Sequence, residues 1–220
     1  MRSPLNSIIG FTSVLLDGME GDLTPAQQEH LRIVSDASHH LLAIINDLLD
    51  MSRIEAGAVV LEIRKFAVNS ALQRVMERFR FEAKEKDLDL RLETSVGEVW
   101  IMGDERRIEQ IVSNLVANAI KYTVAGTVTV SCSREVDAVL RVDVRDTGPG
   151  IPLEDQKRLF TRFTQLKPTD GSLTDGSGLG LAIASGLATA MGGEIALQSA
   201  LGAGSVFSLI LPVQIRGDEQ

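Results

Sequence analysis

A helical segment that carries two asparagines and a lysine on one face constrains this chain most. Apolar residues between Asp104 and Thr123 recur at steps of three and four, which predicts an amphipathic helix. The same spacing puts Asn114, Asn118 and Lys121 on one stripe of that helix. Amide oxygens can bind a hard cation and an ammonium can meet phosphate, so the stripe predicts a surface for magnesium and triphosphate.

Two glycine clusters follow this helix, Asp146-Thr147-Gly148-Pro149-Gly150 and Gly176-Ser177-Gly178-Leu179-Gly180. The second cluster opens an expected helix, residues 181–191, whose free N-terminal amides and positive dipole end suit phosphate oxygens. No recognisable strand precedes it, which argues against a dinucleotide-binding fingerprint. The polar run before it, residues 164–177, is expected to form a mobile lid. Asp-x-Gly is also a common turn sequence, so Asp146 alone is open to that second interpretation.

The order of these motifs resembles that of the sensor histidine kinases. The resemblance covers essentially the whole chain and includes an H box that the family writes H-E-x-R-S/T-P-L-N. The matching segments are Met1–Phe11 (H box), Asn114–Thr123 (N box), Asp146–Gly150 (first glycine box), Phe160–Phe163 (F box), Gly176–Leu181 (second glycine box) and Gly202–Ser205 (third glycine box).

The resemblance implies a site for ATP or ADP with Mg²⁺. In the family the aspartate of the first glycine box accepts a hydrogen bond from the adenine amino group, and a ring such as Tyr122 lies beside the base; core filler is the alternative for Tyr122. Asn118 would ligate the metal, and Lys121 would offset the charge of the triphosphate, although a solvated helix face is the alternative for Lys121. The implied nucleotide-binding residues are Asn114, Asn118, Lys121, Tyr122, Asp146, Gly148, Gly150, Gly176, Gly178, Leu179, Gly180 and Leu181.

The implied catalytic residues are Asn114, Lys121 and Arg162. Other branches of the wider ATPase superfamily place a glutamate at the position of Asn114, where it orients water as a general base. An amide cannot take that proton, so the asparagine favours phosphoryl transfer to a protein over hydrolysis. Arg162 could reach the γ-phosphate or lie in solvent, and related kinases often place the phosphate-binding arginine where this chain has Gln165, which leaves Lys167 as a substitute.

The phosphorylated histidine of the H box would fall two residues before Met1, so the sequence is expected to be a fragment cut within that box. The three histidines present, His30, His39 and His40, lie on the expected second helix and are interpreted as solvated or bundle-rim residues. We therefore expect the catalytic core of a protein-histidine kinase that binds nucleotide without autophosphorylating. Its parent would transfer the γ-phosphoryl group of ATP to its own histidine and then to an aspartate of a response-regulator receiver domain. A nucleotide-binding pseudokinase that only transmits conformation is the alternative.

The predicted fold class is α+β, with a domain boundary near Gly57. Residues 1–57 are expected to form a helical hairpin for dimerisation and histidine phosphotransfer, and residues 58–220 an ATP-binding α/β sandwich of a mixed sheet with helices on one face. The second helix should begin at Pro25, because Thr24 and Gln27 have the spacing of a capping box. Two amphipathic helices cannot bury both apolar stripes alone, so a homodimeric four-helix bundle is expected. A short strand is predicted at residues 60–63.

Composition limits the partners. The formal net charge is -8 and aromatic residues make up 4% of the chain, which argues against nucleic acid. No apolar run is long enough to cross a bilayer, so no direct membrane contact is expected. The single cysteine, Cys132, is interpreted as a small buried hydrophobe on a strand. A cytoplasmic location follows, within a parent that could itself be anchored in a membrane.

Overall fold

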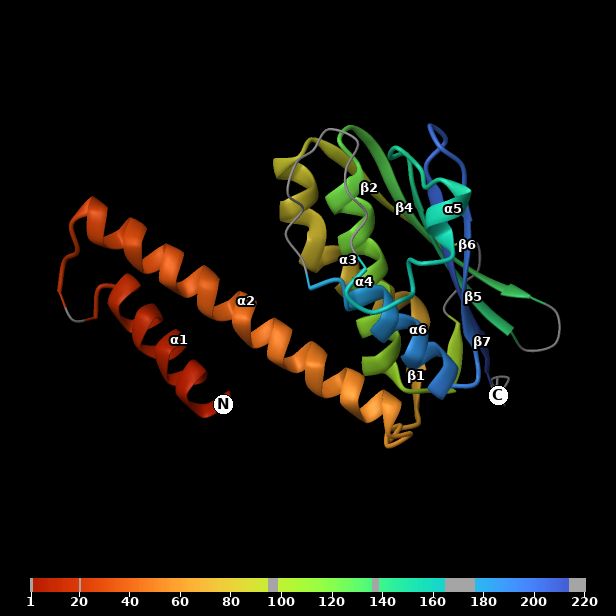
Figure 1. Ribbon diagram of the computed structural model, residues 1–220, viewed down its shortest axis with the longest axis horizontal. Coiled ribbons are helices and arrows are strands. Elements are labelled where there is room, and N and C mark those ends of the chain that lie inside the picture. Colours follow the sequence, from red (N-terminus) through yellow and green to blue (C-terminus); the bar gives the residue numbers. More distant parts are fainter. Residues whose placement is uncertain (1, 20, 95–98, 136–138, 165–176, 214–220) are drawn as a thin grey trace. The chain divides into compact units, whose positions relative to one another are not determined.

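The computed structural model describes residues 2–19, 21–94, 99–135, 139–164 and 177–213 (Figure 1). The chain divides into two units, Met1–Ser52 and Arg53–Gln220. Among the described residues, no helix is both long enough and apolar enough to cross a membrane.

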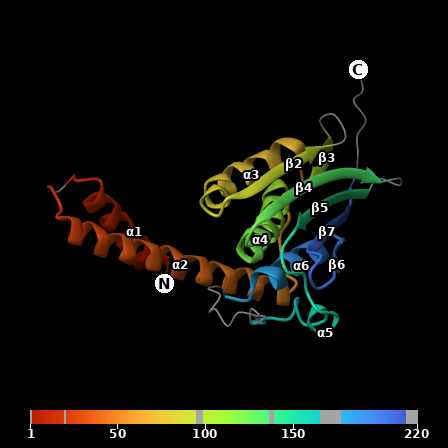
Figure 2. The same cartoon turned by 90° about the horizontal axis from the view of Figure 1, so that it is seen from above.

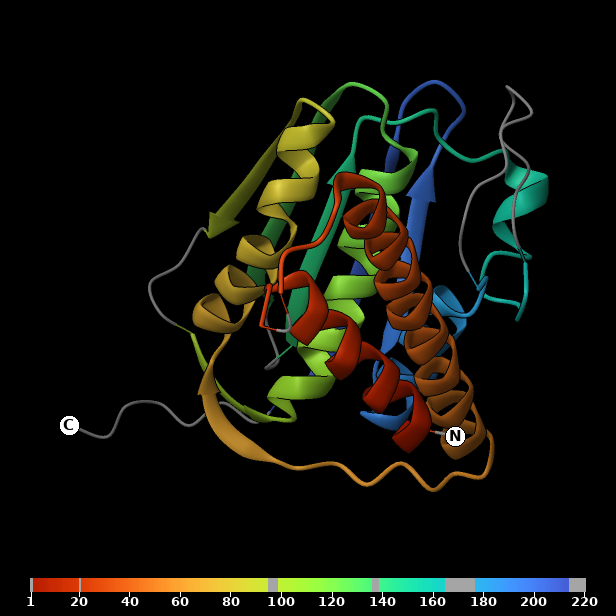
Figure 3. The ribbon, with the colours of Figure 1, turned by 90° about the vertical axis from the view of Figure 1, so that its left-hand side faces the viewer.

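The first unit is a helical hairpin. Helix α1 (Arg2–Leu16) and the longer helix α2 (Pro25–Glu55), whose last turn belongs to the second unit, lie side by side (Figures 1 and 3). The capping box that was predicted before α2 is present: Gln27 N–H donates to Thr24 Oγ1 over 3.3 Å, and Gln27 Oε1 accepts from Thr24 N–H over 2.8 Å. In these two bonds each residue's side chain accepts from the other residue's backbone N–H, so two donors at the helix start are paired. This explains why α2 begins at Pro25.

The second unit is built on a mixed five-stranded sheet in the order β2-β4-β5-β7-β6. The pairing of β2 with β4 is parallel, and the other pairings in this sheet are antiparallel. A separate antiparallel pair joins β1 and β3. The strands are β1 (Arg64–Ala67), β2 (Leu88–Thr94), β3 (Trp100–Gly103), β4 (Gly126–Glu135), β5 (Val139–Asp146), β6 (Glu194–Ser199) and β7 (Ser205–Pro212).

Three helices cover one face of this sheet, as Figure 2 shows. They are α3 (Val68–Glu85), α4 (Glu105–Tyr122) and α6 (Gly180–Ala190). The buried positions of α4 include Ile108, Ile111 and Leu115, at the helical spacing that the sequence predicted. Opposite them, β5 buries every second residue, and Cys132 is buried on β4 as expected. The predicted α+β class and the mixed sheet with helices on one face are confirmed.

Two local predictions differ from the structure. Residues 60–63 are not a strand: Val60 is 80% exposed, and the strand begins only at Arg64, where Phe66 pairs with Ile101 of β3. Residues 60–63 pair with no strand among the described residues, and Glu62 N–H donates instead to the side chain of Asp104. The short helix α5 (Leu153–Gln156) was not predicted, because four residues give no periodic signal.

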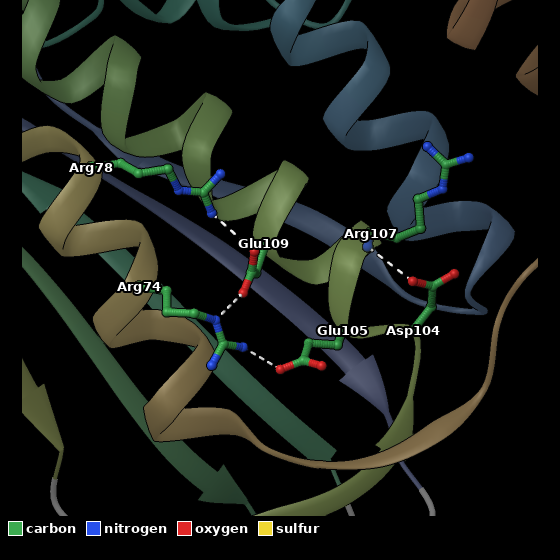
Figure 4. A network of polar contacts seen from close by, with 6 residues as sticks. All are labelled: Arg74, Arg78, Asp104, Glu105, Arg107 and Glu109. Atoms are coloured by element: carbon green, nitrogen blue, oxygen red, sulfur yellow. Dashed lines mark hydrogen bonds and ion pairs between the residues drawn. The ribbon is translucent and has the colours of Figure 1, made fainter.

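An ion-pair network ties α3 to α4 (Figure 4). Arg74 on α3 bonds both Glu105 and Glu109 of α4, the latter over 2.9 Å, and Arg78 donates to Glu109 over 3.0 Å. Burial opposes the charge on Arg74, but the two carboxylates outweigh it and raise its pKa. The network lies at the solvent-exposed edge of the helix pair, so it aligns the two helices more than it stabilises them.

Candidate functional site

Helix α4 is held at both ends. Asp104 accepts from Arg107 N–H over 3.0 Å at the N-terminus of α4, where Figure 4 shows both residues. The other oxygen of the same buried carboxylate accepts from Glu62 N–H over 2.9 Å. At the C-terminus, Lys86 donates to the carbonyl oxygens of Ile120 (3.0 Å) and Lys121 (3.2 Å). A cation at these carbonyls complements the negative end of the helix dipole, so the polar stripe of α4 has fixed ends.

The stripe itself carries three differently engaged side chains, all half-buried. Asn114 donates through its amide nitrogen to the carbonyl oxygen of Gly180 over 3.0 Å, which joins α4 to the first residue of α6. Asn118 has no side-chain hydrogen bond to any other described residue. The ammonium of Lys121 lies 5.0 Å from the centroid of the neighbouring Tyr122 ring, a cation–π distance.

Asp146 ends β5 as a buried carboxylate, with 8% of its surface exposed. Its Oδ1 accepts from Gly148 N–H over 2.9 Å, and it pairs with Ser205 of β7 across the sheet. Burial raises the pKa of Asp146, while the hydrogen bonds from Gly148 and Ser205 oppose that rise. The Asp-x-Gly turn, which was the alternative interpretation of Asp146, is therefore present, and it leaves a buried acceptor at the end of the strand.

One glycine of the first box, Gly150, and one of the third, Gly204, pack against backbone. A Cβ on Gly150 would lie 1.9 Å from the carbonyl oxygen of Ala200, and one on Gly204 would lie 2.1 Å from that of Asp146. Both residues have positive φ, 71° and 77°. These two glycines interlock the loop after β5 with the turn between β6 and β7, so their small size serves the chain's own packing.

Gly148 differs, because the space a side chain would fill is surrounded by oxygens. An added Cβ would lie 2.9 Å from Asp146 Oδ1, 3.3 Å from Thr123 Oγ1 and 3.3 Å from the Tyr122 carbonyl oxygen. The C-terminus of α4 and the end of β5 therefore meet at Gly148.

The second glycine box begins α6. Gly178 packs against the backbone of Phe163 in the F box, where a Cβ would come within 3.0 Å. Leu179 is buried and Leu181 half-buried, so neither presents a polar group. No side chain caps the N-terminus of α6, which leaves backbone N–H groups of its first turn for another acceptor. Gly176 lies outside the described residues.

Arg162 forms an ion pair with Glu55 in the last turn of α2, within the second unit. About half of the Arg162 side chain (49%) and 43% of the Glu55 side chain remain exposed. Gln165 and Lys167, the alternative position and its substitute, lie outside the described residues, as does most of the expected lid.

Three residues at or near the ends of α4 were not identified from the sequence as important for the site. Asp104 could have been recognised, since an aspartate just before an apolar-periodic run is a typical N-cap. Lys86 and Thr123 carry no such signal: the first acts across 34 residues of chain, and the hydroxyl of the second is buried by packing that no local pattern encodes.

No group of three or more His, Cys, Asp or Glu side chains that could hold a metal is found in the part of the chain that the structure describes. Mg²⁺ commonly takes few protein ligands and keeps phosphates and water in its shell. The half-buried amide of Asn118, with no competing hydrogen bond from another described residue, fits such a minimal contact.

Comparison with known proteins places these features in a family. Residues 103–215 match the family model of the histidine kinase-, DNA gyrase B- and HSP90-like ATPases, and residues 1–57 match that of the His Kinase A (phospho-acceptor) domain.

Similar full-length proteins are much longer than this chain. It is 39% identical over 213 residues to the signal transduction histidine-protein kinase BarA of Escherichia coli K12, covering 94% of this chain and 23% of BarA. It is 38% identical over 219 residues to the circadian input-output histidine kinase CikA of Synechococcus elongatus, covering 97% of this chain and 29% of CikA. The chain thus spans about a quarter of these relatives.

Two solved structures extend the similarity to the fold. Full-length ShkA in complex with AMPPNP superposes with a TM-score of 0.84 at 33% identity, over 98% of this chain and 44% of ShkA. The histidine kinase AdeS of Acinetobacter baumannii superposes with a TM-score of 0.69 at 25% identity, over 97% of this chain and 96% of AdeS.

Proposed function

Because this chain belongs to the sensor histidine kinases and carries their phospho-acceptor and ATP-binding domains, we propose that its α4–β5–α6 region binds Mg·ATP as a phosphoryl donor. One observation carries the proposal: the buried carboxylate of Asp146 ends β5 beside the C-terminus of α4, and Gly148 places no side chain against its Oδ1, where a Cβ would come within 2.9 Å. A buried acceptor of this kind suits the amino group of adenine.

The remaining residues follow the nucleotide from base to phosphate. Tyr122 would contact the base beside Asp146. Lys121 would meet the phosphates, and so would the backbone amides of Gly178, Gly180 and Leu181 at the start of α6. The Leu179 N–H already donates to Ser177 Oγ over 3.3 Å. Asn118 would hold Mg²⁺, which supplies charge neutralisation between phosphate oxygens when bound. Four residues would shape the backbone around the nucleotide without contacting it through a side chain: Gly150, Gly176, Leu179 and Gly180.

Asn114 supports transfer over hydrolysis. Its amide is already committed to the carbonyl oxygen of Gly180, so it fixes the start of α6 against α4. An amide in that position cannot act as a general base toward water. We propose that Asn114 keeps the phosphate-binding turn in register with Asn118 and Lys121.

Arg162 would contact the γ-phosphate after leaving Glu55. An exposed ion pair of this type contributes about 0–1 kcal/mol, whereas an arginine on phosphate can form two charge-assisted bonds. The pair with Glu55 is therefore no barrier to this role.

In the parent protein, the γ-phosphoryl group would pass to a histidine of the H box and then to a response-regulator aspartate in the cytoplasm. The 220 residues themselves would bind nucleotide without autophosphorylating, since the histidines present, His30, His39 and His40, lie on α2 and not beside Pro4.

The hairpin would form a homodimer. Apolar side chains on both of its helices are exposed in the single chain, including Phe11 (73%), Ile33 (58%) and Leu41 (49%). Burying them against a second copy removes apolar surface from water, at about 25 cal/mol per Å². Sedimentation of the chain at tens of micromolar should give a dimer, and Leu41→Asp should give a monomer that still binds ADP. A wild-type monomer would refute this part.

Calorimetry tests the nucleotide site. Titration with ADP and excess Mg²⁺ should give saturable heat, and Asp146→Asn should weaken binding at least about ten-fold, as expected for a hydrogen bond to a charged acceptor. Asp143→Asn is the matched control, because Asp143 lies on the same strand but on the other face, paired with Arg141. No heat with wild type, or equal loss in both variants, would refute the assignment.

Label transfer separates the kinase from a pseudokinase. Addition of His-Glu ahead of Met1 restores the family's H-box pattern, and incubation with γ-labelled ATP should then give acid-labile phosphohistidine. The original chain should stay unlabelled. An extended chain that binds ADP but takes up no label would favour the pseudokinase.

A further inference from the structure

The hydroxyl of Thr123 is a buried polar group without a partner among the described residues. Thr123 directly follows the last residue of α4, and its residue exposure is 1%. Its backbone N–H bonds the carbonyl oxygen of Ala119 over 3.0 Å, but Oγ1 has no hydrogen bond. A buried hydroxyl left unpaired destabilises a protein, so groups of this kind nearly always have a partner when the protein works.

The surroundings of this hydroxyl indicate what the partner is. Oγ1, Asp146 Oδ1 and the Tyr122 carbonyl oxygen all lie within 3.3 Å of the point where a Cβ on Gly148 would stand. A carboxylate, a carbonyl and a hydroxyl thus converge beside Gly148. Of the three, only the hydroxyl can donate a hydrogen bond when Asp146 is ionised.

Adenine presents two adjacent groups of opposite kind on one edge. The exocyclic amino group donates, and the neighbouring ring nitrogen N1 accepts. A carboxylate satisfies the amino group but repels the lone pair of N1, so an adenine site built on Asp146 needs a donor beside it. The side chain of Ser205 already donates to the Asp146 carboxylate, so among the described side chains at that place the Thr123 hydroxyl is the donor left for N1.

Resting on the proposed ATP site, we propose that Thr123 is a base-specificity residue whose hydroxyl donates to N1 of adenine, directly or through one bridging water, while Asp146 accepts from the amino group. The pair distinguishes adenine from guanine, because guanine presents the reverse order, a carbonyl acceptor and an N1–H donor. In this arrangement Gly148 is required because a Cβ at this position would press against Asp146 Oδ1, 2.9 Å away.

The test is a cycle between one variant and one ligand analogue. Thr123→Val keeps the shape of the side chain and removes the hydroxyl, and 1-deaza-ADP keeps the amino group and replaces N1 by C–H. Thr123→Val should bind ADP about three- to ten-fold more weakly than wild type, the range for one neutral hydrogen bond. Wild type should bind 1-deaza-ADP with a similar loss, and Thr123→Val should bind 1-deaza-ADP no more weakly than wild type does.

Thr123→Ser, which retains the hydroxyl, should stay within about two-fold of wild type for ADP. The fluorescence of Trp100, the single tryptophan, reports whether each variant keeps its fold. If Thr123→Val loses the same factor for ADP and for 1-deaza-ADP, or loses nothing for ADP, the hydroxyl does not read N1 and the inference is overturned. If wild type binds no ADP, the proposed function itself fails.

Discussion

Replacing Gly204 by alanine should disrupt the nucleotide site from outside it, and Gly202 offers a matched control. The two glycines belong to the same turn between β6 and β7 and have nearly the same backbone conformation, with φ of 77° and 79°. They differ in surroundings: a Cβ on Gly202 meets nothing within 4 Å, whereas a Cβ on Gly204 would lie 2.1 Å from the carbonyl oxygen of Asp146.

The expected magnitudes follow from these two facts. An alanine in the left-handed region costs about 1 kcal/mol in either position. At Gly204 the backbone of the β5 end must also move, and forced overpacking adds about 1–3 kcal/mol. Gly202→Ala should therefore destabilise the second unit by about 1 kcal/mol and Gly204→Ala by about 3 kcal/mol, or about 3 °C against 9 °C in Tm for a domain of this size.

Thermal unfolding followed by Trp100 fluorescence measures the difference, because Trp100 lies in β3 of the same unit. ADP calorimetry below the transition measures the effect on the site. Gly202→Ala should bind ADP as wild type does, and Gly204→Ala should bind it more weakly, since it displaces Asp146. Equal Tm values for the two variants would show that the contact between the third glycine box and Asp146 does not constrain the fold.

Three further predictions concern single groups. Burial raises the pKa of Cys132 to about 11, so its thiol should resist alkylation by iodoacetamide at neutral pH in the folded protein. It should react after the protein is unfolded in urea. Burial raises the pKa of Asp146 above the ordinary 3.8, so in the folded protein this carboxylate takes up a proton at a higher pH than an ordinary aspartate does. ADP affinity should therefore fall on acidification before an ordinary aspartate titrates. Calorimetry at several pH values checks this, with Asp146→Asn as the control that should show no such dependence. Lys86→Met removes the cation from the C-terminus of α4 and should lower the free energy of unfolding by about 0.5–1 kcal/mol in urea titrations, with Lys86→Arg closer to wild type.

Periodicity and caps made part of this structure predictable. The helix predicted between Asp104 and Thr123 is confirmed as α4, because the apolar spacing that indicates a helix acts within a few residues. The predicted start of α2 after Thr24 was also confirmed, because a capping box acts within a few residues. The strand predicted at residues 60–63 was wrong because strand formation depends on a partner, and β3 pairs only with Arg64 onward.

The packing roles of individual glycines could not be predicted from the sequence, because they too depend on contacts with distant parts of the chain. The sequence predicts that Gly148 and Gly150 lie in a turn, but their neighbours are set by long-range packing: Ala200 lies against Gly150 across 50 residues of chain. The sequence could therefore suggest a nucleotide site, while the distinction between a glycine that leaves a polar space and one that interlocks loops required the folded chain.

The contacts that hold α4 keep the proposed nucleotide site in place before any ligand binds. Asp104 caps the helix and also accepts from Glu62 in the segment between α2 and β1, while Lys86 closes the opposite end. Asn114 then joins the helix to α6, and Gly204 keeps Asp146 in place. None of these contacts needs nucleotide. In contrast, Thr123 has no hydroxyl partner among the described residues, and Arg162 pairs with Glu55 in an exposed ion pair. The contacts that position α4, α6 and Asp146 are thus complete without ligand. Thr123 and Arg162, which are proposed to meet the base and the γ-phosphate, make the weakest contacts of their own. Ligand binding therefore need break few interactions that stabilise the fold.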